Sequence, residues 1–388
     1  MSTATDFLMI EAGLTPEEAD IRDTVARFAS SELAPHINEW HDAGRVPREL
    51  AQRFGQLGVL GMHLDGPGCP DMSAVAYGLA CRELEAVDSG IRSFVSVQGS
   101  LAMYAIHRWG SETQRASYLP RMAAGDVIGC FGLTEPDSGS DPGSMRTSAR
   151  LDPSGDWILN GTKMWITNGT IADIAIVWAR DHDGLVRGFV VPTDTPGFSA
   201  TVIQRKLSLN ASATAILNLD DVRLPAAALL PAAQGLSGPL SCLNEARFGI
   251  LWGVVGAART CFAEALDYSL VRRQFGRPLA AFQLSQRKIA EMAILVNNAS
   301  LVAYHLGRTK DATRLSSAQV SYGKLHNVRA AAEVARIARG LLGAAGITLD
   351  HATMRHLVNM ETVATYEGTE EIHALSIAGE LTGIRSFR

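Results

Sequence analysis

The segment 364–373, "ATYEGTEEIH", places chemically capable side chains at the edge of a helical region. Three carboxylates, Glu367, Glu370 and Glu371, fall within five positions, and Gly368 follows the first of them. Carboxylates are among the side chains that transfer protons in enzymes. Glu370 and Glu371 are interpreted as solvated acids at the start of a helix. Glu367, beside a glycine at the end of a large apolar region, is the candidate for chemistry.

A second candidate is Arg92 in the segment "AVDSGIRSFVSVQ". Asp88 or Ser89 is suited to the N-cap of a helix, which places Arg92 in the first turn among apolar neighbours. A cation is unfavourable at that end of the helix dipole, so an anion is expected nearby. The sequence leaves open whether the anion is the internal Glu85 or the carboxylate of a bound substrate.

Three further segments offer binding chemistry, each with an ordinary structural alternative. "CFGLTEPDSGSDPGSM" leads from a short apolar strand into a loop of hydroxyls and backbone N–H groups, or into a long surface turn. "MWITNG" puts Trp165 and Thr167 on one strand face, where they can hold a planar ring, although the pattern alone favours a core tryptophan. In "VRRQFGRPL", Arg272 can grip a phosphate or be an ordinary cation at a helix C-terminus.

Other common site motifs are missing from the sequence. There is no GxxxxGK[ST] phosphate loop, and "GLLGAAG" follows a helical run, which favours close helix packing or a helix end over a dinucleotide fingerprint. None of the ten histidines forms an HExxH motif or a close pair. The sequence therefore predicts no metal site.

The elements that must position these residues fall into three stretches of the 388-residue chain. Helical spacing dominates at first, with a capping box at Thr15 and Glu18 and a break expected at Pro120. Short Ile-, Val- and Trp-rich runs separated by turns follow, and long helical segments complete the chain. We predict an N-terminal helical domain over 1–125, a middle β-barrel domain over 126–236 and a C-terminal four-helix bundle over 237–388.

Composition limits the classes of partner. The chain is 47% hydrophobic and 19% charged with a net charge of −5, so no nucleic-acid partner is predicted. Five scattered cysteines are interpreted as buried, reduced thiols. The N-terminus lacks a targeting pattern, and no unbroken apolar run reaches the length of a membrane span. We expect a cytoplasmic protein without membrane insertion.

Four motifs together resemble the acyl-CoA dehydrogenase family, in the family's order and over nearly the whole chain: "CFGLTEPDSGSD", "WITNG", "RRQFG" and "YEGTEEIH". Within the family the chain is most similar to the glutaryl-CoA dehydrogenases, through "RELEAVDSGIRS", "RFGILWGVVGAA" and a C-terminus with "IHAL" and "LTGIRSF". The resemblance implies a three-domain α+β fold of helices, β-barrel and helical bundle. It also implies a homotetramer that binds one FAD per subunit.

The resemblance implies that Glu367 is the catalytic base. It takes the α-proton of the acyl-CoA while a hydride leaves the β-carbon for the flavin. The enolate must be stabilised as it forms, and the implied donors are the Glu367 backbone N–H and a ribityl hydroxyl of FAD. Gly368 lets the chain turn so that the carboxylate and the amide of Glu367 both face the substrate. Burial is expected to raise the pKa of Glu367.

The resemblance also implies two groups of FAD contacts. Trp165 flanks the isoalloxazine ring and Thr167 bonds near N5, while Arg272 and Phe275 reach the adenine-side half of FAD in a neighbouring subunit. The further implied contacts are Phe131, Leu133 and Thr134 at the pyrimidine edge, Ser140 between FAD and substrate, Gln283 and Thr369.

For the substrate, the resemblance implies that Arg92 binds the terminal carboxylate of glutaryl-CoA. The assisting residues are Glu85, Ser93 and Tyr366, with Ser140 beside the substrate and Arg247 supporting the catalytic glutamate. After oxidation, loss of carbon dioxide would give crotonyl-CoA, and an electron-transferring flavoprotein would accept the electrons.

Two departures and three alternatives stand beside this interpretation. Gly340 and Glu380 occupy positions where many family members carry glutamine and a basic residue, which concerns FAD and subunit contacts. The first alternative is another acyl-CoA dehydrogenase, for a dicarboxylyl or short-chain thioester, without decarboxylation. The second is an oxidase that uses oxygen, and the third is a non-catalytic relative that uses the fold for binding.

Overall fold

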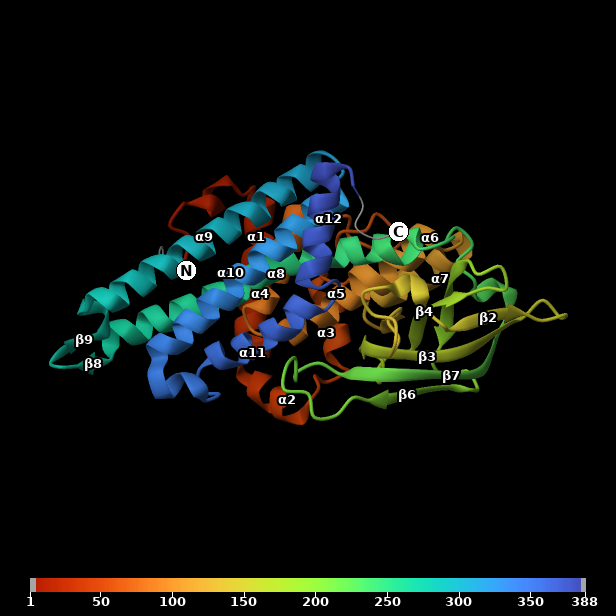
Figure 1. The fold of residues 1–388 in the computed structure, drawn as a ribbon, viewed down its shortest axis with the longest axis horizontal. Coiled ribbons are helices and arrows are strands. Elements are labelled where there is room, and N and C mark those ends of the chain that lie inside the picture. The colour runs from red at the N-terminus through yellow and green to blue at the C-terminus, as the bar shows by residue number, and fades with distance from the viewer. Residues whose placement is uncertain (1–4, 385–388) are drawn as a thin grey trace.

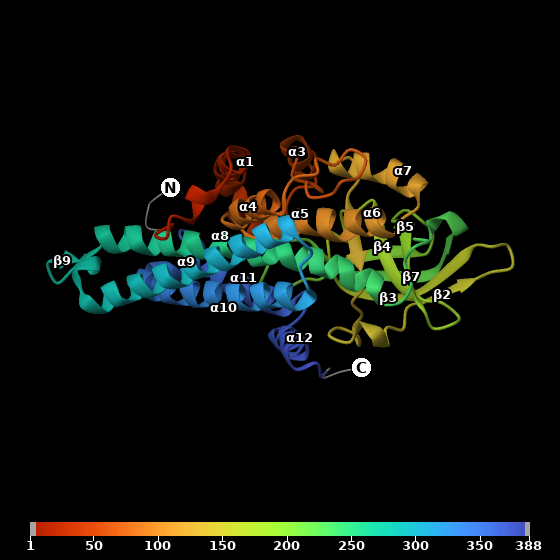
Figure 2. The same ribbon diagram turned by 90° about the horizontal axis from the view of Figure 1, so that it is seen from above.

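The computed structural model describes residues 5–384. The molecule is elongated, with long helices at one end and a sheet at the other (Figures 1 and 2). The motif "LTGIRSF" runs beyond the described residues. In the described part, the α-helices before the sheet are α1 (Pro16–Phe28), α2 (Ile37–Ala43), α3 (Leu50–Leu57), α4 (Ala74–Glu85), α5 (Ser89–Ser96), α6 (Tyr104–Trp109) and α7 (Glu112–Ala123).

Short helical turns join these elements. Two have π-type bonding, and the second of them links α5 to α6. The turns are η1 (Ile10–Gly13), η2 (Ala29–Leu33), η3 (Ala34–His36), η4 (Val97–Met103), η5 (Pro142–Ser144), η6 (Ala226–Ala228), η7 (Leu279–Ala281) and η8 (Gly343–Ile347).

A curled seven-stranded sheet forms the middle of the chain, as the three-stretch pattern predicts. Its order is β1-β4-β2-β3-β7-β6, with β5 paired to β4. Most of the pairing is antiparallel, but β4 pairs in parallel with β1 and, at one residue pair, with β2. The strands are β1 (Gly129–Gly132), β2 (Ser148–Leu151), β3 (Trp157–Thr167), β4 (Ile174–Arg180), β5 (Val186–Pro192), β6 (Phe198–Val202) and β7 (Thr214–Leu224).

The remaining helices build the C-terminal bundle, with a small hairpin at the end of the molecule far from the sheet (Figures 1 and 2). Helix α8 is apolar on most of its circumference and lies in the core, where a helix that is hydrophobic all round belongs. The elements are α8 (Ser237–Val271), β8 (Arg273–Gln274), β9 (Arg277–Pro278), α9 (Gln283–Ala312), α10 (Ser317–Leu342), α11 (Ala352–Thr365) and α12 (Glu370–Thr382).

Local signals explain several helix ends. The predicted capping box is confirmed, because Thr15 and Glu18 satisfy each other's backbone N–H groups at the start of α1. Gly343, in "GLLGAAG", follows α10 with a φ of 59°, so the helix-end interpretation is confirmed. The break expected at Pro120 is wrong, because this proline lies inside α7. Leu119 and Met122, both fully buried, hold the last turn of α7 in place despite the missing N–H.

Two helices are long and apolar enough to cross a membrane by length and composition alone, α8 and α9. This corrects the expectation that no segment reaches that length, because scattered polar residues interrupt the apolar run but leave the mean hydropathy high. The apolar window of α8 is 78% buried inside the protein, as in a core helix, while that of α9 is 33% buried. Such helices are weak evidence for a membrane protein.

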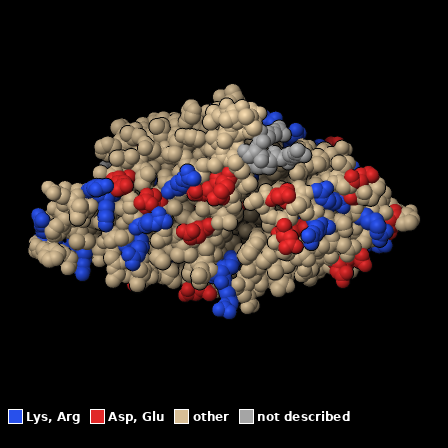
Figure 3. Space-filling model, viewed as in Figure 1, with Lys and Arg blue, Asp and Glu red and all other residues tan. Residues whose placement is uncertain are grey.

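Surface charge is of mixed sign on the face shown in Figure 3, with acidic and basic side chains interspersed. All five cysteines are free. Four are buried, as predicted, and Cys69 is partly exposed.

Candidate active site

The loop between α11 and α12 carries Glu367 in an unusual backbone conformation. Glu367 has a φ of 54° and Gly368 a φ of 103°, so two successive residues lie in a region that side chains rarely adopt. A Cβ at Gly368 would come within 3.0 Å of the His373 ring and 3.2 Å of Arg247. The glycine after the glutamate is therefore required both by conformation and by space.

Two buried cations hold the carbonyl groups of this loop. Lys324 of α10 donates to the carbonyl oxygens of Tyr366 and, at 2.7 Å, of Gly368. Arg247 of α8 donates from Nε to the carbonyl oxygen of Glu367 at 2.7 Å. Arg247 thus lies beside Glu367, where the family resemblance places it. Lys324 is not among the residues singled out from the sequence, where the only signal is a lysine on the mostly apolar buried face of α10.

The Glu367 side chain has a free acceptor atom. Its Oε2 is buried and has no hydrogen-bond partner within residues 5–384. The backbone N–H of Glu367 likewise has no acceptor among the described residues. Burial raises the pKa of Glu367, as predicted, while the positive charges of Arg92, Lys324 and Arg247 oppose that rise. A carboxylate with a raised pKa is a better proton acceptor.

Arg92 lies fully buried in the first turn of α5, which Asp88 caps. Its Nε donates to Glu85 Oε2 at 2.6 Å, so the internal anion considered from the sequence is present. A second nitrogen, Nη2, donates to the Tyr366 hydroxyl, and Ser93 lies 3.3 Å from that same hydroxyl. The third nitrogen, Nη1, is buried without a partner in the described part of the chain.

Arg92 and Glu367 therefore lie close together. Tyr366 touches Arg92 through its hydroxyl and precedes Glu367 in the chain. Burial raises the pKa of Tyr366 to about 12, so the phenol keeps its proton at neutral pH. The four residues expected around a substrate carboxylate, Arg92, Glu85, Ser93 and Tyr366, are brought together.

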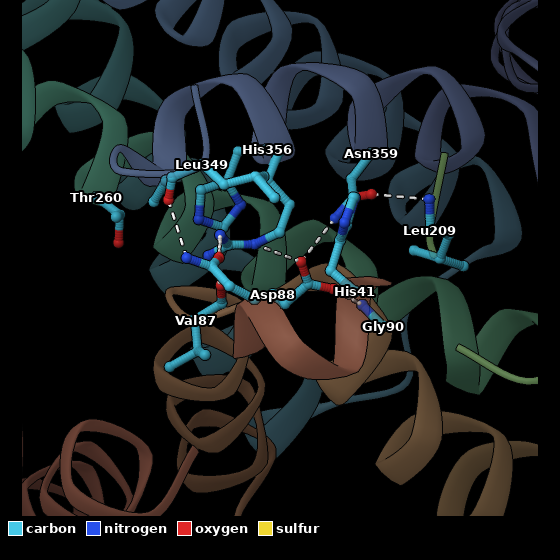
Figure 4. Close-up of polar contacts among 12 residues, drawn as sticks. His41, Val87, Asp88, Gly90, Leu209, Thr260, Leu349, His356 and Asn359 are labelled. Carbon is cyan, nitrogen blue, oxygen red and sulfur yellow. Dashed lines mark hydrogen bonds and ion pairs between the residues drawn. The ribbon is translucent and has the colours of Figure 1, made fainter. Parts of the chain in front are cut away.

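A buried polar network joins helix α5, which carries Arg92, to helix α11, which leads to Glu367 (Figure 4). Asp88 accepts from Arg355 Nε at 3.0 Å and from Asn359 Nδ2 at 2.9 Å, both on α11. Arg355 also donates to the Val87 carbonyl, and Asn359 accepts from the backbone N–H of Leu209. The start of α5 is thereby bonded to α11, which leads to Glu367. Beyond the capping role of Asp88, these residues were not singled out from the sequence.

The loop after β1 is held by another buried ion pair. Lys163 of β3 donates to Glu135 at 2.8 Å and to the Leu133 carbonyl at 3.0 Å. Glu135 also accepts from two backbone N–H groups of the same loop. The polar segment therefore has an ordered conformation, and Phe131, Leu133 and Thr134 are held beside strand β3.

Trp165 is not a core residue. Strand β3 changes register between Lys163 and Ile166, and Trp165 takes a φ of 64° there. The irregularity leaves Ile166 buried and turns Trp165 outward, 56% exposed. The N–H of Met164 donates to the Thr134 carbonyl at 2.8 Å, so the β1 loop adjoins Trp165. The core alternative favoured by the sequence pattern is wrong.

These residues fit a flavin. An exposed aromatic side chain, redirected by a strand irregularity, lies next to a loop rich in backbone and hydroxyl donors. Thr167 lies two positions after Trp165 in β3 and is only partly buried. Successive side chains of a strand point to opposite faces, and the buried side chain between Trp165 and Thr167 is Ile166. Ser140 is exposed in the β1 loop, and Thr369 caps α12 through its hydroxyl.

Three expected FAD contacts lie elsewhere in the protomer. Arg272 lies between α8 and β8, Phe275 lies in the β8–β9 turn, and Gln283 is the first residue of α9; the hairpin is at the end of the molecule far from the sheet (Figures 1 and 2). All three are exposed. One chain therefore does not bring them to Trp165.

Comparison with known proteins agrees with this geometry. Family models match over residues 15–126 (acyl-CoA dehydrogenase, N-terminal domain), 130–222 (middle domain) and 233–382 (C-terminal domain). An acyl-CoA dehydrogenase of Bacillus subtilis is 34% identical over 377 residues, covering 95% of this chain and 99% of its own length. The chain belongs to the acyl-CoA dehydrogenase family. It is an FAD-dependent oxidoreductase that acts on acyl-CoA.

Two solved structures show which kinds of protein the chain is similar to within and around this family. A glutaryl-CoA dehydrogenase from Mycobacterium smegmatis in complex with FADH2 is 56% identical, with a TM-score of 0.98 and 100% coverage of both chains. A chain in the structure of an electron transferring flavoprotein of Acidaminococcus fermentans is 32% identical, with a TM-score of 0.91, covering 95% of this chain and 99% of that one.

Proposed function

We propose that this protein oxidises glutaryl-CoA and decarboxylates the product to crotonyl-CoA. The observation that carries the proposal is a pair of atoms, Nη1 of Arg92 and Oε2 of Glu367, which are buried in one cluster and have no hydrogen-bond partner among residues 5–384. A cation and a base, each with one free atom, suit a substrate with a carboxylate at one end and an acidic C–H near the other. The 56% identity to a glutaryl-CoA dehydrogenase supports the same substrate.

In this proposal Glu367 removes the α-proton. Oε2 is buried, and no side chain or backbone group in the described part of the chain donates a competing hydrogen bond to it, so it is available as the acceptor. The free Glu367 N–H donates to the thioester oxygen, where negative charge develops as the proton leaves. Bound FAD supplies the acceptor for the hydride from the β-carbon. Arg92 holds the far carboxylate, which sets the distance between the reacting carbons and Glu367.

The residues proposed to hold FAD form two sets. The flavin-ring set is Phe131, Leu133, Thr134, Ser140, Trp165, Thr167 and Thr369. The set proposed to act on a neighbouring subunit's FAD is Arg272, Phe275 and Gln283, since these lie far from the ring set within one chain. The positions Gly340 and Glu380 are exposed, so contacts there would be with cofactor or another subunit.

Decarboxylation needs no further group on the protein. After oxidation, the bond between the γ-carbon and the carboxylate can break, so that carbon dioxide leaves and its bonding electron pair stays on the γ-carbon, delocalised into the thioester. Glu367, protonated by the first step, then returns its proton to the γ-carbon, which gives crotonyl-CoA. Once carbon dioxide has left, Glu85 remains as the partner of Arg92.

The working assembly is part of the same proposal. We propose a homotetramer, which would cover the exposed hairpin and the exposed apolar side of α9. An electron-transferring flavoprotein is the proposed acceptor, as the similarity to a chain in such a structure supports. The free cysteines support a reducing cytoplasmic location. The 1–125, 126–236 and 237–388 segments are the proposed domains.

Substrate choice tests the proposal. Purified holoenzyme would be mixed anaerobically with glutaryl-CoA or butyryl-CoA while flavin absorbance and acyl product are followed. Glutaryl-CoA should bleach the flavin about 10²-fold faster, because butyryl-CoA leaves a buried donor of Arg92 unpaired, at a cost of about 1–3 kcal/mol. Crotonyl-CoA should form from glutaryl-CoA.

The Arg92→Met variant is the matched comparison. It should lose the preference for glutaryl-CoA, while binding of FAD stays unchanged. Bleaching by butyryl-CoA alone in the unmodified protein would favour a short-chain dehydrogenase and leave Arg92 as the structural partner of Glu85. Formation of glutaconyl-CoA without crotonyl-CoA would favour the non-decarboxylating alternative.

A further inference from the structure

A buried lysine, Lys324, contacts the loop of residues 366–368 that carries Glu367, called the base loop below. Lys324 is 1% exposed, and no carboxylate lies within ion-pair distance of it in the described part of the chain. A buried ammonium without a paired carboxylate is costly unless its donors are satisfied. Its acceptors are the carbonyl oxygens of Tyr366 and Gly368, on either side of Glu367.

Peptide planarity connects these bonds to catalysis. The carbonyl of Tyr366 and the N–H of Glu367 belong to one trans peptide unit, so they point in opposite directions. Because Lys324 holds the Tyr366 carbonyl on its own side, the Glu367 N–H must face away from Lys324. That N–H is the one without an acceptor in residues 5–384.

The backbone at Glu367 needs such support. A glutamate with a φ of 54° is sparsely populated and persists only where its surroundings impose it. Arg247 fixes the central carbonyl of the loop, and Lys324 fixes the two flanking carbonyls. Three consecutive carbonyls are thus held by two side chains from two different helices.

We propose that Lys324 is a positioning residue: by holding the carbonyls of Tyr366 and Gly368, it turns the amide and the carboxylate of Glu367 toward the substrate. This inference rests on the proposed function, in which Glu367 is the base and its N–H binds the thioester oxygen. Lys324 itself does not touch the substrate in this scheme.

The charge of Lys324 has a second effect. Burial lowers the pKa of Lys324 to about 7, an effect that Glu367 and Glu370 oppose and that Arg247 and Arg92 reinforce. The ammonium in turn is one of the cations that lower the pKa of Glu367.

The other titratable groups around Lys324 do not remove the interaction between the charges of Lys324 and Glu367. His373 of α12 packs against the same loop, and burial lowers its pKa to about 3, so it is neutral above pH 5. The titratable or charged groups facing Lys324 are Glu367, Glu370, Arg247, Arg92, Tyr366 and His373.

Replacement of the lysine tests the proposal in the holoenzyme. Lys324→Met should lower the rate of flavin bleaching by glutaryl-CoA about 10²-fold, because misplacing a reacting group by about 1 Å costs that much. KM should change less than the rate constant. The acid limb of the pH–rate profile should move to higher pH, because removing a cation raises the pKa of Glu367.

Two further variants separate structure from charge. Lys324→Gln keeps a donor but lacks the charge, so it should recover part of the rate while the acid limb stays displaced. Arg336→Met is the matched control, since Arg336 is an exposed cation on the same helix and pairs with Glu333 of that helix rather than with Glu370. It should leave both rate and pH profile unchanged. FAD content and thermal midpoint identify any variant that fails to fold, and the Gln variant then carries the test.

The outcomes distinguish this inference from the proposed function. A Lys324→Met protein with an unchanged rate and an unchanged pH profile overturns the role of Lys324, provided that Glu367→Gln is inactive. A lowered rate without any shift of the acid limb, in both the Met and the Gln variant, overturns the effect of the charge. If Glu367→Gln stays active, the proposed base is wrong and the role of Lys324 falls with it.

Discussion

Two turns of this molecule have the same backbone conformation, a residue with positive φ followed by a glycine, but lie in different surroundings. In the loop after α11, Glu367 with a φ of 54° is followed by Gly368; in the β8–β9 hairpin, Phe275 with a φ of 50° is followed by Gly276. The first turn is partly buried, and its carbonyls are bonded by cations from other helices. The second presents a phenylalanine that is 93% exposed, with one edge contact to Phe282.

The difference separates two parts of the proposed chemistry. The residues proposed to transfer the proton and to bind the substrate carboxylate come together within one chain, from α4, α5, α8, α10 and the loop that carries Glu367. The hairpin has its own bonds, from the Leu279 N–H to the Arg272 carbonyl and between its strands, but its aromatic side chain packs on almost nothing. A turn that holds an aromatic ring outward in a strained conformation is suited to a surface outside its own protomer.

The largest effect is expected from removing the base. Glu367→Gln keeps the size of the side chain but cannot accept the α-proton, so turnover should fall by about 10⁴-fold. FAD binding should persist, because no FAD-ring residue depends on this carboxylate. Stopped-flow bleaching of the flavin with glutaryl-CoA measures the effect, and a variant within tenfold of the unmodified rate would contradict the assignment.

The second prediction tests whether the buried cluster is held by contacts inside the protomer. Arg355→Met removes the ion pair with Asp88 and the bond to the Val87 carbonyl, leaving a buried carboxylate short of one partner. Stability should fall by about 3–5 kcal/mol. The exposed pair of Arg329 and Glu370 is the control, since loss of such a pair costs about 0–1 kcal/mol. Denaturant midpoints in saturating FAD measure both, and equal losses would contradict the buried-network argument.

The sequence could predict the parts of this site that lie in local motifs. Glu367 and Arg92 can be selected as candidates from short segments, and the helix–sheet–helix order can be predicted from the residue pattern along the chain. Lys324 could not be predicted in its role, because it contacts a loop 44 positions away and only the packing of α10 against that loop reveals it. Arg355 and Asp88 are likewise brought together by tertiary packing over 267 positions.

Two errors have local physical causes. The alternation of strand β3 predicts Trp165 in the core, but a register shift after Lys163 changes which side chains face outward. Pro120 predicts a helix end, yet buried neighbours in α7 outweigh one lost hydrogen bond. In both places tertiary packing overrides the local pattern.

The smallest effect, and the one that most sharpens the comparison between the two turns, is expected at the hairpin. Phe275→Asn keeps a residue that tolerates positive φ, so the turn itself should persist. Because Phe275 is 93% exposed, protomer stability should change by less than about 0.5 kcal/mol. FAD affinity should nevertheless fall about tenfold if the ring packs on the cofactor of a neighbouring subunit, since that would be the loss of about 1.4 kcal/mol of contact. Leu185→Asn, an exposed apolar residue in the β4–β5 turn, is the control. Equilibrium FAD titration with sedimentation of each variant measures affinity and assembly together; unchanged FAD affinity in the Phe275 variant would remove this residue from the cofactor site and leave the buried cluster as the part of the site supported by contacts within one chain.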